Sequence, residues 1–235
     1  MLVLALDTST PTVTAAVVTV RMPHEVTPPV TADSFFSLDA ERSVTDSLAH
    51  AEQLMPLATA ALAEAGHRLR DLDAVVVGLG PGPFTGLRVG IATASAVGDA
   101  LGVPVHGVPS HDAVAAVTEP GQAFLVATDA RRREVYLSCY AADGRRVIGP
   151  VVVAPGAVAE LVADQAPAFR TGAGAGLLDD TGLPVRAPGG CPGLGLVRVA
   201  GKSLVTGVVP GPLTPLYLRR PDATAPTKRK SVLGK

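Results

Sequence analysis

The sequence is poor in cysteine, in aromatic residues and in charge. Two cysteines, Cys139 and Cys191, are too few for a disulfide framework, so we expect a reduced, cytoplasmic environment. Aromatic residues make up 3% of the chain and tryptophan is absent, which leaves alanine, valine and leucine to fill the core. No apolar run approaches the ~18 residues of a membrane span, and the first residues lack the basic region of a secretory signal. A net charge of −1 disfavours a protein that holds nucleic acid by bulk charge alone.

The abundant residues are small or apolar. Apolar residues make up 47% of the 235 positions, enough for a sizeable core, and there are 25 glycines and 21 prolines. This length fits one large domain or two small fused lobes. Runs of β-branched residues predict strands, and an apolar period of 3.6 residues predicts helices. The predicted strands cover residues 2–6, 13–20, 35–44, 74–77, 103–108, 124–128, 134–140, 146–153 and a stretch near Phe169, and the predicted helices cover 52–66, 86–101, 111–117, 156–164 and 194–203.

A strand that ends in an aspartate begins each half of the chain. Asp7 follows an apolar strand and Val13 opens the next strand, and Asp129 and Val135 repeat this spacing. Strand and helix alternate in the later part of the first half, which indicates a parallel region in its sheet. The repeat therefore predicts an α/β protein of two lobes built on the same βββα plan.

The tetrapeptide Asp7-Thr8-Ser9-Thr10 lies on the turn after the first strand. Backbone N–H groups and hydroxyls on such a turn can surround a phosphate, while the carboxylate acts through a metal ion or a water molecule. The alternative is that Asp7 is a turn residue whose carboxylate accepts hydrogen bonds from its own backbone. The tetrapeptide alone leaves both interpretations open.

A glycine-rich loop, residues 78–90, leads into the second predicted helix and has the composition of a generic anion-binding loop. It matches neither the dinucleotide fingerprint nor the Walker A motif, because Pro83, Thr85 and Leu87 stand where those motifs require glycine or lysine. The loop therefore does not identify a phosphate site by itself.

The helix after that loop carries small residues at every fourth position, Gly86, Gly90, Ala94 and Gly98. Glycine inside a helix costs about 1 kcal/mol relative to alanine, so this row requires a compensating close approach of another backbone. The approach is made either by the sheet of the same chain or by a helix of a partner chain.

Three arginines, Arg131 to Arg133, stand on the turn between two predicted strands, and Lys228, Arg229 and Lys230 lie in the C-terminal tail. Both groups fit contact with phosphate or RNA, and a solvated turn or tail is the simpler interpretation. Signatures of metal sites and nucleophiles are missing, since the sequence contains no H-E-x-x-H and no G-x-S-x-G pattern.

Five segments together resemble the TsaB (YeaZ) family, a bacterial subunit required to make threonylcarbamoyladenosine on tRNAs that read codons beginning with A. The segments are LALDTST, HAEQLMP, VGLGPGPFTGLRVGIATA, TDARRREVYLSCY and PLYLR. The likeness is strong over residues 1–140, patchy over 150–215, and strong again over 215–219. It implies an α/β, actin-like (sugar-kinase and heat-shock-ATPase type) fold of two βββαβα-type lobes with mixed sheets. The implied parts are an N-terminal lobe with partner-binding helices over 1–110, a degenerate C-terminal lobe over 111–220, and a loose basic tail over 221–235.

The resemblance implies a non-catalytic scaffold subunit that has no cofactor of its own. Its partners would be the metal-containing transferase subunit TsaD and the ATPase TsaE, with ADP or ATP shared at the interface of the complex. TsaD transfers threonylcarbamoyl from its adenylate to A37 of tRNA, and its metal-binding His-x-x-x-His motif is missing from this sequence. The tRNA would be reached through the complex, and the isolated chain would form a homodimer. Two other functions stay open, an ATP-dependent phosphotransferase that uses Asp7 and a metallopeptidase.

The resemblance also assigns site residues by their position in the chain, and it gives this chain no catalytic residue and no metal ligand. A partner interface is expected on two helices, at His50, Gln53, Leu54, Leu57, Phe84, Leu87, Gly90, Ile91 and Ala94. A reduced nucleotide site is expected in the cleft between the lobes, at Asp7, Thr8, Ser9, Thr10, Gly172 and Gly174.

Overall fold

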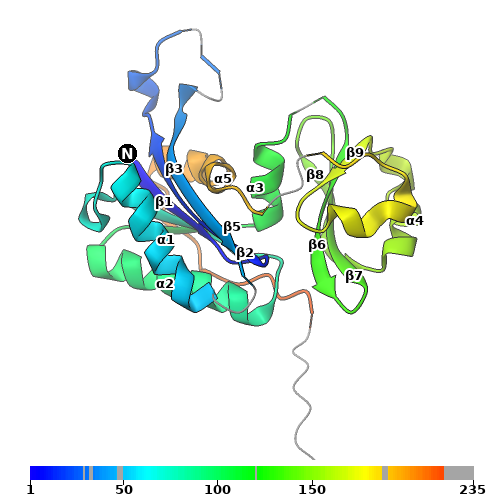
Figure 1. The fold of residues 1–235 in the computed structure, drawn as a ribbon. Helices are drawn as coiled ribbons and strands as arrows, with labels where there is room; N and C mark the ends of the chain where they lie inside the picture. Colours follow the sequence, from blue (N-terminus) through cyan, green and yellow to red (C-terminus); the bar gives the residue numbers. More distant parts are fainter. Residues whose placement is uncertain (29, 32–33, 47–49, 120, 187–189, 220–235) are drawn as a thin grey trace, which may run out of the picture.

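Two β-sheets, each with its own helices, stand side by side in the computed structural model (Figure 1). The structure describes residues 1–28, 30–31, 34–46, 50–119, 121–186 and 190–219, so the predicted basic tail lies outside the described residues. This arrangement confirms the α/β class with two mixed sheets. No helix among the described residues has both the length and the apolar character needed to cross a membrane.

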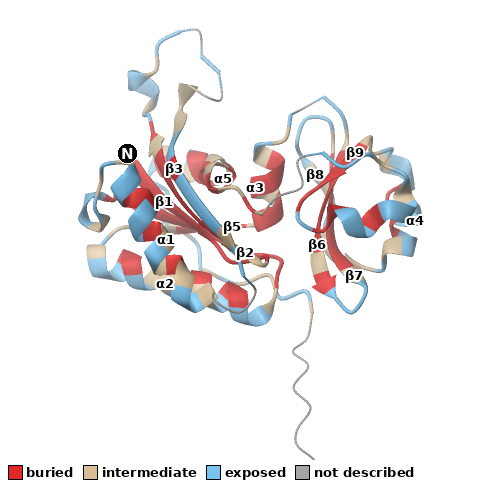
Figure 2. Cartoon of the chain, viewed as in Figure 1, coloured by how far each residue is buried: buried red, intermediate tan, exposed pale blue. Residues whose placement is uncertain are grey.

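The first sheet has five strands in the order β3-β2-β1-β4-β5. Strands β1 to β3 form an antiparallel meander, and β4 and β5 add to β1 in parallel. Every residue of β1 is buried, because helices cover both faces of the sheet (Figure 2). The strand bounds are β1 Leu2–Asp7, β2 Thr12–Val20, β3 Phe36–Thr45, β4 Ala74–Gly78 and β5 Val105–Val108.

Four helices sandwich this sheet. Helices α1 and α2 pack on one face around Leu4 and Val75, and α3 and α5 pack on the opposite face around Val3 and Val76. Helix α5 follows the second sheet in sequence and returns to the first, so the chain crosses between the sheets more than once. The helix bounds are α1 His50–Glu64, α2 Phe84–Leu101, α3 Ser110–Ala116 and α5 Gly193–Thr206.

The second sheet has four strands in the order β8-β7-β6-β9 and carries little helix. One face is covered by the short helix α4 and by 3-10 turns, and the other face packs toward α3 with the stacked rings of Phe124, Tyr140 and Phe169. The bounds are β6 Phe124–Arg131, β7 Glu134–Tyr140, β8 Arg146–Val153, β9 Phe169–Thr171 and α4 Val158–Leu161.

The predicted helices over 52–66, 86–101, 111–117 and 194–203 are present, with ends shifted by up to three residues. In the described residues α1 begins at His50, two residues before the predicted start, and keeps Pro56 inside it. The predicted helix over 156–164 is reduced to one α-helical turn between 3-10 turns. Its only buried side chains are Val158 and Val162, a stripe too narrow to stabilise a longer helix.

Candidate functional site: the cleft between the sheets

Two adjoining cavities occupy the cleft between the sheets, with volumes of about 540 and 630 Å³. They share Thr12, Ser43 and Gly190, so they are neighbours within the cleft. Volumes of this size lie in the range of small-molecule pockets. The cleft is therefore large enough for a ligand of the size of a nucleotide.

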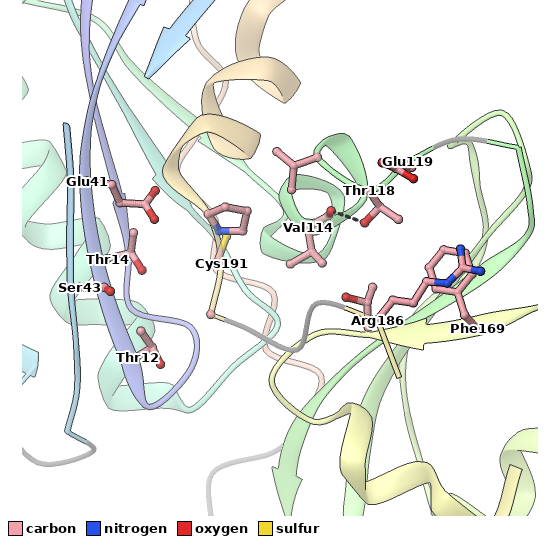
Figure 3. A pocket seen from close by; sticks show the side chains of 14 residues that line it. Thr12, Thr14, Glu41, Ser43, Val114, Thr118, Glu119, Phe169, Arg186 and Cys191 are labelled. Carbon is pink, nitrogen blue, oxygen red and sulfur yellow. Dashed lines mark hydrogen bonds between the residues drawn. The ribbon is translucent and has the colours of Figure 1, made fainter. Parts of the chain in front are cut away.

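The cavity of about 540 Å³, shown in Figure 3, has a polar wall and an apolar wall. Thr12 and Thr14 of β2 form part of the polar wall, and Val114 and Phe169 belong to the opposite wall. The guanidinium of Arg186 lies 4.3 Å from the centre of the Phe169 ring, in cation–π contact. A ligand in this cavity would meet hydroxyls on one side and an aromatic ring with its arginine on the other.

Glu41 of β3 ties the first sheet to the start of α5 at the edge of the same cavity. Its Oε2 accepts a hydrogen bond of 2.8 Å from the backbone N–H of Gly193, the first residue of α5. A carboxylate is favourable at this position because the helix N-terminus carries partial positive charge. Glu41 therefore has a structural partner in addition to lining the cavity.

Asp7 lies at the end of β1 and is completely buried. Its carboxylate accepts three hydrogen bonds, from the backbone N–H of Ser9 (2.8 Å), the Ser9 hydroxyl (2.6 Å) and the Ser110 hydroxyl (2.6 Å). Burial raises the pKa of Asp7 above its usual range, although these hydrogen bonds oppose the shift. The bonds to Ser9 are those of a turn residue, and Asp7 does not line either cleft cavity.

Thr8 is buried as well and connects the turn to α2. Its hydroxyl donates a hydrogen bond of 2.7 Å to the carbonyl of Gly86. A Cβ atom added at Gly86 would lie 2.5 Å from the Thr8 carbonyl oxygen, and one added at Gly90 would collide with the Thr8 hydroxyl. Gly98 in the same way accommodates Val105 of β5. The small-residue row therefore serves close packing inside the chain, the first of the two alternatives that the sequence left open.

All six predicted nucleotide residues are buried, and two of them also line the cleft. Ser9 and Thr10 line the cavity of about 630 Å³, together with Ala173, which lies between Gly172 and Gly174. Gly172 and Gly174 lie beside it, where the backbone of β6 leaves no room for a Cβ atom. The structure thus brings the two predicted loops to one cavity.

The charge around that cavity is acidic. Asp129 lines it, and no lysine or arginine does so among the described residues. A phosphate group there would need a divalent cation or protonated groups to offset the carboxylate. Among the described residues, no three His, Cys, Asp or Glu side chains gather into a metal-binding group. Nucleotide binding stays a prediction.

The predicted partner residues fall into a buried group and an exposed or partly exposed group. Leu54, Leu87, Gly90 and Ala94 are buried inside the chain and contribute to its own core. The other five, His50, Gln53, Leu57, Phe84 and Ile91, are partly or largely exposed along α1 and α2. A partner could reach only the second group in this conformation, and the interface itself stays a prediction.

Two residues of the region between the sheets were not identified as site residues from the sequence. His111 of α3 hydrogen-bonds through both ring nitrogens, to Ser138 at 2.9 Å and to Thr128 at 3.0 Å. Burial and the nearby Arg146 lower its pKa to about 3. Ser110 links Asp7 to α3. The adjacency of Ser110 and His111 is visible in the sequence, but partners so distant along the chain give no local pattern.

Comparisons with known proteins agree on one family. A family model described as "TsaD: tRNA N6-adenosine threonylcarbamoyltransferase" matches residues 45–191. An uncharacterized protein of Mycobacterium tuberculosis is 45% identical over 221 residues, which cover 94% of this chain and 93% of that one. The tRNA threonylcarbamoyladenosine biosynthesis protein TsaB of Haemophilus influenzae is 38% identical over 92 residues, 38% of this chain and 39% of that one.

A solved structure extends the likeness over almost the whole chain. YeaZ from Pseudomonas aeruginosa matches with a TM-score of 0.69 and 28% identity, and covers 92% of this chain and 99% of that one. The predicted actin-like fold of two lobes with mixed sheets is thereby confirmed.

Proposed function

The chain belongs to the TsaB (YeaZ) branch of the tRNA threonylcarbamoyltransferase family, and from that membership we propose that it is a non-catalytic subunit of tRNA threonylcarbamoyladenosine biosynthesis. It pairs in the cytoplasm with a TsaD-like catalytic subunit and a TsaE-like ATPase, and this complex modifies A37 of tRNAs that read codons beginning with A. The observation that carries the proposal is the likeness to YeaZ over 92% of the chain.

The geometry at Asp7 supports a role without catalysis. A phosphotransferase that used this carboxylate would need it in the cleft, within hydrogen-bond reach of the reacting group. Asp7 is instead fully buried, and three donors from Ser9 and Ser110 occupy its oxygens. This supports the scaffold over the phosphotransferase that the sequence also left open.

The exposed sides of α1 and α2 are the proposed contact with the TsaD-like subunit, and the same surface would join two copies of the isolated chain. Gln53, Leu57 and Ile91 lie on these helices and are partly exposed. Leu57 and Ile91 pack at the edge of the core and leave part of their apolar surface uncovered. An apolar strip on two adjacent helices fits a helical partner.

Depletion and rescue test the function. A strain depleted of this protein should lose threonylcarbamoyladenosine from its tRNA, measured by mass spectrometry of digested nucleosides, and the wild-type chain should restore it. Unchanged modification after depletion would contradict the proposal.

Co-purification tests the interface. Gln53→Arg with Ile91→Glu places charge on α1 and α2 and should abolish recovery of the TsaD-like subunit, while Glu160→Arg on the exposed side of α4 should not. If the Gln53 and Ile91 variant recovers as much TsaD-like subunit as the Glu160 variant does, the interface lies elsewhere on the chain.

Nucleotide is proposed to bind only in the assembled complex, at the cavity lined by Ser9, Thr10 and Asp129. Calorimetry with Mg-ADP should give binding to the complex and none to the isolated chain. Hydrolysis of ATP by the isolated chain would instead support the alternative function, an ATP-dependent phosphotransferase.

A further inference from the structure

The hairpin between β6 and β7 has a two-residue loop made of arginines in an uncommon conformation. Arg131, Arg132 and Arg133 have φ values of 64°, 54° and 61°. A two-residue hairpin loop of type I′ requires positive φ at both central positions and favours asparagine and glycine there. Each non-glycine residue in the left-handed region costs about 1 kcal/mol. The chain thus keeps arginines at a turn where Asn-Gly would be more stable, and such strain is typical of functional positions.

This arginine turn is held in place by the C-terminal segment. The guanidinium of Arg219 donates hydrogen bonds to the carbonyls of Ala130 and Arg131 and forms an ion pair with Glu134. Figure 1 shows the tip of β6 and β7 at the same lower edge of the molecule as the segment that ends at residue 219. Arg219 therefore positions the turn from outside the hairpin.

A further arginine stands beside the turn. Arg88 of α2 lies 3.6 Å from the centre of the Phe84 ring, and its Nε donates a hydrogen bond of 3.0 Å to the hydroxyl of Tyr217. Phe84 and Tyr217 line a small cavity of about 190 Å³ together with Arg131 and Arg132, so the two groups of side chains share one surface. We call Arg88, Arg131, Arg132 and Arg133 the arginine surface.

Basic residues are concentrated in two parts of the sequence, the arginine surface and the last sixteen residues. The arginine surface holds four of the 20 basic residues, and residues 220–235, which follow Arg219 directly, hold five more with only one acidic residue. Acidic residues outnumber basic ones in the rest of the chain. Arginine at such a density matches phosphate, because its planar guanidinium binds phosphate oxygens in pairs.

We propose that the arginine surface binds the phosphate backbone of RNA. The proposal rests on the proposed function, which makes tRNA the RNA concerned. Phe84 belongs to the predicted partner helix, so tRNA bound here would lie beside the predicted contact with the catalytic subunit. An acidic protein surface is the competing occupant.

The test uses the complex of this chain with its TsaD-like subunit and a tRNA that reads a codon beginning with A. Arg132→Asn with Arg133→Gly removes two charges and relieves the turn, so the variant should fold. We expect its tRNA affinity, measured by fluorescence anisotropy at several KCl concentrations, to fall about tenfold, and the slope of log affinity against log salt to shrink by about 1.5.

Matched controls separate charge from conformation. Arg70→Asn with Arg145→Asn removes the same charge from exposed sites elsewhere and should leave the slope unchanged. Arg132→Lys with Arg133→Lys keeps the charge and should keep most of the slope. Affinity and slope equal to those of the Arg70 and Arg145 variant would overturn the proposal.

Two other results also decide the matter. Loss of the TsaD-like subunit from the Asn-Gly variant, with tRNA affinity of the remaining chain unchanged, would identify a protein contact and overturn RNA binding. Failure of the proposed function is seen separately, since depletion of the protein would then leave the modification of tRNA unchanged. Restored modification together with unaltered tRNA binding by the variant would overturn the RNA contact alone.

Discussion

The turn after the first strand of each sheet begins with the same pattern and meets opposite surroundings. Asp7 is buried beneath α2 and α3 and accepts three hydrogen bonds, whereas Asp129 is partly exposed and lines the cleft. The first turn is covered because Gly86 and Gly90 let α2 approach Thr8. The second sheet has no helix of that length among the described residues, and its turn carries the exposed arginines. The same local pattern thus gives a buried turn that is part of the core in the first lobe and a partly exposed turn in the second.

The largest expected difference concerns the two aspartates. Asp7→Ala removes the acceptor of three buried hydrogen bonds and should lower the free energy of unfolding by about 3 kcal/mol, because the Ser9 and Ser110 donors are left unsatisfied. Asp129→Ala, which loses a bond of 2.6 Å from the Arg131 N–H at the surface, should cost about 0.5 kcal/mol. Urea unfolding measures both, and equal losses would contradict the contrast between the turns.

Substitution of a glycine that lets α2 pack closely on the first turn should give the next largest change in stability. Gly86→Ala gains helix propensity but places a Cβ 2.5 Å from the Thr8 carbonyl oxygen, so we expect a net loss of about 2 kcal/mol. Gly176 in the second lobe has open space around its Cβ position, and Gly176→Ala should change stability by less than about 0.5 kcal/mol. A neutral Gly86 variant in thermal unfolding would show that α2 is not tightly seated on the turn.

The sequence predicts most of the fold because its signals are local. Strand and helix periodicity placed nearly every element within a few residues, and the repeat of Asp7 and Asp129 indicated two related lobes. It did not predict which chain the glycine row contacts, because Gly86 and Thr8 are far apart in the sequence. The state of Asp7 was undetermined for the same reason, since Ser110 is brought to it only by folding. The sequence indicated which residues lie near the cleft, but it did not indicate which of them are buried.

The connection between the lobes has a pH dependence of its own. His111 of α3 bonds to Thr128 and Ser138 of the second sheet, and burial, with a contribution from Arg146, lowers its pKa to about 3. The unfolded chain, with a histidine pKa near 6.5, therefore binds more protons, and stability falls as the pH falls below that value. From pH 7.5 to 5.5 this residue should account for a loss of about 1.4 kcal/mol.

The contribution of His111 is measured as a difference, because burial also lowers the pKa of His106. His111→Gln should show a smaller fall in the free energy of urea unfolding between pH 7.5 and 5.5 than the wild type, whatever its stability at pH 7.5. His67→Gln, at a position that is only partly buried, is the control and should keep the wild-type slope. Equal slopes for wild type and His111→Gln would mean that His111 is accessible to protons in the folded protein.

The smallest effect has the opposite sign and arises at the second turn. Arg132→Asn with Arg133→Gly fits both residues to positive φ, so the free energy of unfolding should rise by about 1 kcal/mol. Relief of the strain in the left-handed region drives this gain, and the added flexibility of glycine in the unfolded chain offsets part of it. Thermal unfolding of the variant beside Arg70→Asn with Arg145→Asn separates turn strain from lost charge. A gain in stability confined to the hairpin variant would mean that the arginines of the second turn lower the stability of the protein. The first turn would then differ, since the changes proposed there are all expected to lower the stability. A loss would mean that the arginines stabilise their own turn, and the two turns would then both be structural.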